Sequence, residues 1–235
     1  MNTSGIKLAI IWMWTTTSLA VAQPSSSLGI LPSVNLNGRI NERWSVNSKV
    51  EARFPLIEHT AVSPTGFSPS YELTDLSFIG ARKVGLDNRI GIGYLLRLRE
   101  NEFHHRLIQQ FTIVQRLSGF RLAHRFSSDQ TISPTESMEF RLRYRISSEI
   151  PLNGKSADPK EAYFKLNNEY LGSWQNGTFD TEIRLVPLIG YTATPRSKFE
   201  AGVDYRARSL FTDSMRNNVW ISLNWFYQLD FKNED

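Results

Sequence analysis

Residues 137–146 alternate strictly between apolar and charged side chains, and this pattern constrains the fold more than any other feature of the sequence. The apolar set is Met138, Phe140, Leu142, Tyr144 and Ile146, and the charged set is Glu139, Arg141, Arg143 and Arg145. Successive side chains of a β-strand point to opposite faces, so this strand would have one apolar and one ionic face. In a transmembrane barrel these faces meet lipid and a polar lumen. The pattern therefore predicts a strand of an outer-membrane β-barrel.

The same alternation recurs along the chain from Trp44 onward and predicts an all-β, antiparallel barrel of about 10–12 strands. A weaker segment covers Val34–Ile40. Short turn sequences, such as Ser118-Gly119 and Asn176-Gly177, separate the segments and make them antiparallel neighbours. We expect an even number of strands, because both ends of such a chain should return to the periplasm.

Three segments fit the pattern less well. Tyr71–Val84 loses phase around Thr74, where a β-bulge would restore it. Pro187 falls inside a predicted strand, and a local bulge would accommodate it because proline cannot donate to a ladder. Glu161–Trp174 also fits an amphipathic helix.

The first 22 residues have the features of a cleaved signal peptide. Lys7 precedes the apolar stretch Leu8–Trp14, and Ala20-Val21-Ala22 forms a cleavage site. The expected organisation is residues 1–22 as signal peptide, 23–43 as an N-terminal extension and possible first strand, 44–231 as the barrel and 232–235 as a polar tail. No stretch of the mature chain has the ~20 consecutive apolar residues of a spanning helix, so we expect any spanning segment to be a strand.

A soluble periplasmic barrel or sandwich that acts as a binding module is an alternative, because alternation also fits strands between a core and water. Two features favour the membrane barrel. Aromatic residues, among them Trp44 and Phe179, stand near the ends of the apolar faces, as in interfacial girdles. The chain also ends on a ladder of Trp225, Tyr227, Leu229 and Phe231, similar to the signal that recruits such barrels for assembly. The expected partners are outer-membrane lipid, lipopolysaccharide and the barrel-assembly machinery.

Several short motifs resemble a known family. They are His105-Arg106 with Gln109-Gln110-Phe111, Leu122–Arg125 with Asp129-Gln130-Thr131, Arg141–Arg145 with Pro151–Gly154, and Asn168-Glu169-Tyr170. Together they resemble a domain-of-unknown-function family of predicted Gram-negative outer-membrane β-barrels, over nearly the whole mature chain. The resemblance implies the barrel and the outer membrane of a Gram-negative bacterium as its location. It implies no catalytic residue, because no activity is attached to the family.

Charged side chains on the inward parity are the main candidates for a functional site. They are Arg97, Arg99, Arg106, Arg121, Arg125, Glu139, Arg141, Arg143, Arg145, Glu169, Glu182, Glu200, Asp204 and Arg206. The arginines come earlier in the chain than most of the carboxylates, so a basic wall would face an acidic wall after closure. These side chains either form a salt-bridge network that fills the lumen of a structural protein, or a porin-like constriction that passes small polar or anionic solutes.

The histidines carry the enzymatic alternative. His104, His105 and His124 lie near acidic residues, and an enzyme acting on lipid at the barrel rim would use such a histidine as general base. The motifs G-x-S-x-G and H-E-x-x-H are absent from the sequence, and so is cysteine. We expect a non-enzymatic protein with no cofactor and no metal. Because Lys and Arg are spread at period two and not gathered in one tract, nucleic acid is not an expected partner.

Overall fold

The described residues form an eleven-stranded closed barrel with a short twelfth strand outside the wall. The computed structural model describes residues 25–60, 63–154, 156–211 and 215–231. Its strands are β1 (Ser25–Arg39), β2 (Trp44–Thr60), β3 (Ser63–Phe67), β4 (Leu73–Lys83), β5 (Asn88–Arg99), β6 (Glu102–Leu117), β7 (Phe120–Ile132), β8 (Glu139–Pro151), β9 (Ala162–Gln175), β10 (Thr178–Thr192), β11 (Ser197–Arg208) and β12 (Arg216–Asp230). The predicted all-β antiparallel barrel is confirmed. In the described residues, no helix is long and apolar enough to cross a membrane.

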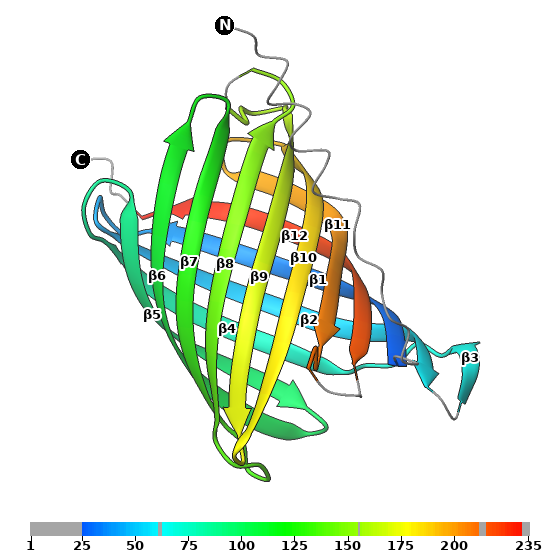
Figure 1. Cartoon of the computed structure of the whole chain (residues 1–235). Helices are drawn as coiled ribbons and strands as arrows, with labels where there is room; N and C mark the ends of the chain where they lie inside the picture. The colour runs from blue at the N-terminus through cyan, green and yellow to red at the C-terminus, as the bar shows by residue number, and fades with distance from the viewer. Residues whose placement is uncertain (1–24, 61–62, 155, 212–214, 232–235) are drawn as a thin grey trace, which may run out of the picture.

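The wall closes through a parallel pairing of β1 with β12. Every other pair of neighbours in the wall, including β1 with β2, is antiparallel. The short strand β3 pairs with β2 and projects sideways from the wall (Figure 1). In the same view β6 to β10 rise steeply at the front, while β1, β2, β4 and β12 cross behind them at a large angle. Such tilting is what a sheet needs to close on itself.

The even strand count expected from the sequence is wrong. Because β1 runs parallel to β12, Ser25 and Asp230 lie at opposite ends of the barrel. We call them the N-terminal end and the C-terminal end. The wall also begins at Ser25 and not at Trp44, so most of the expected extension 23–43 is a full strand. The predicted signal peptide and polar tail lie outside the described residues.

The turns between strands divide between the two ends as strand direction requires. Ser118-Gly119, between β6 and β7, lies at the C-terminal end, and Asn176-Gly177, between β9 and β10, lies at the N-terminal end. Asn176 and Gly177 both have positive φ, 52° and 73°. Two such residues form the turn whose twist matches that of a hairpin.

Both bulges predicted inside the wall are absent. The register of β2 with β4 continues unbroken past Thr74, and the register of β9 with β10 continues past Pro187. A register shift occurs instead between β1 and β2, at Leu28/Gly29. Residues 161–174 form most of strand β9, so the alternative reading as a helix is wrong.

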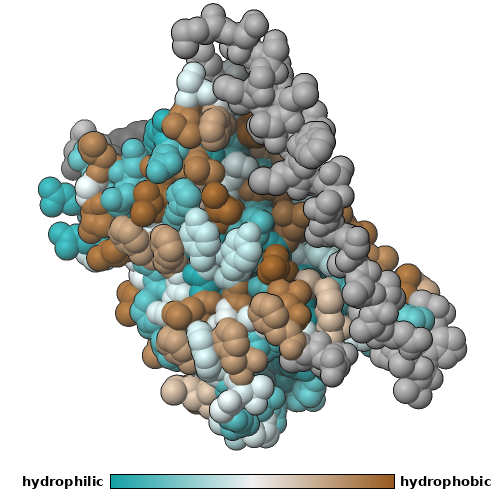
Figure 2. Space-filling model, viewed as in Figure 1, coloured by the Kyte–Doolittle hydropathy of each residue, from teal (hydrophilic) through white to brown (hydrophobic). Residues whose placement is uncertain are grey.

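Side-chain parity separates the two faces of the wall. Large apolar residues of the outward parity are exposed on nearly every strand, including Val50, Ile92, Leu142 and Trp225. Figure 2 shows brown apolar residues over much of the visible wall, with hydrophilic ones interspersed. The interior is dominated by buried polar and charged side chains, together with a few large apolar ones such as Tyr163 and Trp220. The barrel is therefore apolar outside and ionic inside.

Candidate functional site in the charged lumen

A buried acid joins two of the arginines that mark the most regular strand. Asp129 on β7 is 0% exposed and accepts a hydrogen bond from the Arg143 guanidinium on β8 at 2.7 Å. Arg141 approaches the other carboxylate oxygen at 3.2 Å and also lies 3.6 Å from Glu139. Asp129 thus accepts one charge-assisted hydrogen bond, from Arg143, and makes a second ion pair with Arg141 that lacks hydrogen-bond geometry.

The network continues from β8 to β11 as alternating charges. Glu169 accepts a hydrogen bond from Arg145 at 2.7 Å and lies 3.1 Å from Arg184. Arg184 in turn donates to Glu182 at 2.5 Å, and Arg208 lies 3.0 Å from the second oxygen of Glu182. Each carboxylate therefore pairs with two cations, which lie on its own strand or on the strands beside it.

Near the closing seam, an aromatic ring takes the place of a carboxylate. Trp220 projects inward from β12, and the guanidiniums of Arg53 and Arg206 lie over its ring at 5.9 and 6.0 Å. Cations over an indole face are stabilised by the ring quadrupole, more so when desolvated. Arg206 is also held by Asp204 at 2.8 Å, and Arg53 lies 3.8 Å from Glu51. The network thus extends past the seam to β2.

The other candidate residues are held locally or lie in solvent. Arg97 makes a bidentate pair with Asp75, Arg106 donates to Thr131, and Glu200 accepts hydrogen bonds from Tyr163 and Lys165. Arg99 pairs with Glu100 at the exposed N-terminal rim, while Arg121 and Arg125 are exposed. The pairs join residues of the same strand or of strands one or two positions apart in the wall, so the arrangement is not the expected basic wall facing an acidic wall.

Several members of the network were not singled out from the sequence. They are Glu51, Arg53, Asp75, Asp129, Tyr163, Arg184, Arg208 and Trp220. Asp129 stands beside Ser127 and Ser128, so it resembled part of a loop, although its parity matches that of Arg125 and Arg121. Trp220 is the harder case: its parity, shared with Asn218, Ser222 and Asn224, places it on the inner face, but nothing in the sequence indicates that two arginines lie over its ring.

On β8 and β2, the exposure of inward side chains falls from the C-terminal end towards this network. Along β8, side-chain exposure is 32% at Arg145, 20% at Arg143 and 10% at Arg141. Lys49 and Arg53 on β2 follow the same trend, from half-buried to buried. Along β8 and β2 the lumen is therefore more open nearer the C-terminal end, whereas on β9 and β11 Tyr163 and Glu200 are buried near that same end.

The histidines do not form a catalytic arrangement with serine or aspartate among the described residues. His105 and His124 have the outward parity, and their Nδ1 atoms lie 2.5 and 2.8 Å from the hydroxyls of Tyr94 and Tyr144. His104 has the inward parity and is half-buried. Nor do the described residues contain a group of three His, Asp or Glu side chains that could hold a metal ion.

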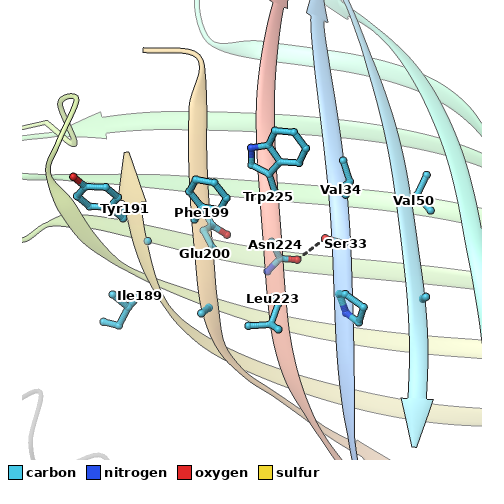
Figure 3. A pocket seen from close by; sticks show the side chains of 14 residues that line it. Ser33, Val34, Val50, Ile189, Tyr191, Phe199, Glu200, Leu223, Asn224 and Trp225 are labelled. Carbon is cyan, nitrogen blue, oxygen red and sulfur yellow. Dashed lines mark hydrogen bonds between the residues drawn. The ribbon is translucent and has the colours of Figure 1, made fainter. Parts of the chain in front are cut away.

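A shallow groove of about 550 Å³ crosses the outer face over the closing seam. Figure 3 shows Tyr191, Phe199, Trp225 and Val34 projecting from β10, β11, β12 and β1. The polar pair across the seam, Ser33 with Asn224 at 2.6 Å, belongs to the inward parity. The groove is thus lined mainly by apolar side chains, and the hydrogen bond across the seam lies on the inner face of the wall.

One comparison with known proteins gives a match. Residues 28–218 match the model of a family described as "Protein of unknown function (DUF2490)". No curated protein and no solved structure matches the chain. The matched range begins within β1 and ends within β12, so it covers most of β1 but only the first three residues of β12.

Proposed function

The chain belongs to the DUF2490 family of proteins of unknown function, and we propose that it is an integral β-barrel of the outer membrane of a Gram-negative bacterium. The observation that carries this proposal is the division of its side chains, with large apolar residues exposed on the outside and ion pairs inside. A soluble barrel would place its apolar face on a core and its ionic face in water. This division is the one that lipid outside and a polar interior require.

Strand length and closure support the same proposal. A transmembrane strand needs roughly 9–11 residues, and the strands of the wall have 11 to 17. Closure pairs every edge of the wall, which a membrane requires because lipid cannot hydrogen-bond a free edge. The outward aromatic pairs Phe140 with Trp174 and Phe199 with Trp225 are suited to the two interfaces.

Within the membrane we propose a structural barrel whose lumen is sealed by its ion-pair network. Asp129, Glu169 and Arg206 are buried in this network, and each makes an ion pair on the inner face of the wall. A narrow passage for small polar or anionic solutes is the second candidate. The observation that favours it is the partial exposure of the inward cations Arg145 and Lys49, which are 32% and 33% exposed.

Cysteine labelling on whole cells tests the membrane proposal and its orientation. Ser68 and Ser26 are exposed at the N-terminal end, and Ser118 is exposed at the C-terminal end. With the C-terminal end in the periplasm, an impermeant maleimide should label cysteine at 68 and 26 and should spare cysteine at 118 until the outer membrane is opened. Equal labelling of all three positions would refute a spanning barrel. If cysteines at 26 and 118 were labelled under the same conditions while cysteine at 68 was not, positions 26 and 118 would lie on the same side of the membrane, and the eleven-stranded arrangement would be wrong.

Conductance in planar bilayers separates the sealed lumen from the passage. A sealed wild type should show almost no conductance, and Arg143→Glu should chiefly lower stability by placing a second carboxylate beside Asp129. An open passage would conduct with anion preference, and the same variant would shift selectivity towards cations. Anion-selective conductance that reverses in Arg143→Glu would establish the second candidate in place of the first.

A further inference from the structure

Arg125 faces inward but takes no part in the ion pairs of the network. It lies near the middle of β7, on the same parity as Asp129, yet it is exposed. No carboxylate of the described residues lies within 4 Å of it, in contrast to Arg141, Arg143 and Arg145 on the neighbouring strand. An exposed side chain at this height means that open space surrounds Arg125 in the lumen.

The residue opposite Arg125 is another arginine. Register places Arg125 directly across from Arg145 on β8, and like charges directly opposite on a sheet are destabilising. The carboxylate that acts on Arg125 from beyond ion-pair distance is Glu169, which Arg145 and Arg184 already hold. Positive charge is therefore in local excess at this point of the lumen.

The surroundings of the pair suit an oxyanion. Thr112 lies across from Arg125 on β6, and Ser127 follows on the same face of β7. These hydroxyls add neutral donors beside two guanidiniums, whose planar forks match the oxygens of phosphate. Arg145 donates its Nε to Glu169 at 2.7 Å.

We infer that Arg125 and Arg145 form a binding site for a small phosphate-type anion, which enters the lumen from the C-terminal end. The entry side follows from β7 itself, because Arg121 and Arg125 are exposed whereas Asp129 and Thr131, nearer the N-terminal end, are buried. A phosphate attached to a membrane lipid would not reach the middle of the strand from inside the barrel, so the ligand is a free solute. The inference deepens the proposed function and rests on its view of the lumen as a compartment open at one end.

Inorganic phosphate tests the site on the folded full-length protein in detergent micelles. At constant ionic strength, replacing chloride with phosphate should raise the thermal unfolding midpoint of the wild type until the site saturates, since a ligand that binds the folded state stabilises it. Arg125→Gln should lose this rise, and it should unfold at a higher midpoint than the wild type without phosphate because the like-charge contact is gone. Arg116→Gln is the control for net charge, as Arg116 is an exposed arginine at the end of β6. It should keep the full rise.

Two results would overturn the site: no phosphate-dependent rise in the wild type, or an equal rise in Arg125→Gln. Should Arg125→Gln fail to fold, Arg125→Lys takes its place, because it keeps the charge but loses the fork. A reduced rise in Arg125→Lys supports the site, and an undiminished one refutes it. Failure here leaves the labelling and conductance results unaffected, so it is distinguishable from failure of the membrane proposal.

Discussion

Replacing Asp129 with asparagine tests whether the ion pairs of the lumen stabilise the barrel. The amide has nearly the size of the carboxylate, so the change removes a charge without leaving a cavity. Two guanidiniums then lose their partner, Arg143 from 2.7 Å and Arg141 from 3.2 Å. Removing one partner of a buried ion pair costs roughly 3–5 kcal/mol. Arg141 keeps Glu139 at 3.6 Å, so we expect a loss near the lower value, about 3 kcal/mol.

Reversible urea unfolding in lipid vesicles, followed by tryptophan fluorescence, measures this loss. Asp87→Asn is the matched control, because Asp87 lies 3.8 Å from Arg116 at the exposed C-terminal rim. An exposed pair contributes about 0–1 kcal/mol, so the control should unfold almost like the wild type. Adding Arg143→Gln to Asp129→Asn should recover part of the stability by removing the unpaired cation. If Asp129→Asn unfolds within about 1 kcal/mol of the wild type, the argument that the network stabilises the barrel is wrong.

Two further substitutions test the outer face and the packing of the interior. Leu142→Arg should destabilise the barrel in vesicles by roughly 2–4 kcal/mol, whereas Leu86→Arg in the exposed β4–β5 turn should have no measurable effect. Equal effects would mean that Leu142 does not face lipid. Gly190→Ala should cost roughly 1–3 kcal/mol in the same assay, because its Cβ would lie 2.2 Å from the Tyr163 ring. Gly66→Ala, with no atom within 4 Å of the new Cβ, is its control and should be neutral.

The face of each side chain could be predicted because it depends on a local property. Period two is set by the backbone of each strand, so Leu142 and Arg143 had to point to opposite faces wherever their strand lay. For the same reason, turn residues such as Asn176-Gly177 could be found directly. The bulges were predicted wrongly at Thr74 and Pro187, because polar or irregular residues there were read as a change of backbone phase. The wall accepts them in an unbroken register.

The partners of the charged residues could be predicted in kind but not individually. Arginine and carboxylate on the inward parity had to pair somewhere, since unpaired charge is costly inside a barrel. Register decided that Asp129 pairs with Arg143 and that Arg125 faces Arg145. If one strand slipped by a single residue, its inward side chains would move to the outer face and these pairs would be lost. Register between strands depends on contacts that no single strand contains. The excess of charge at Arg125 is therefore a property of the assembled sheet.

Alternation along the sequence by itself determined that the chain folds into strands with one apolar and one ionic face, because that information lies within a few consecutive residues. Only the tertiary structure decided that eleven strands close the barrel and that the last pairing is parallel. That pairing joins residues 191 positions apart, as in Ser33 with Asn224. Whether β1 completes the wall depends on the barrel width and strand tilt that all the other strands set together. Closure is therefore a property of the whole barrel and not of any one segment.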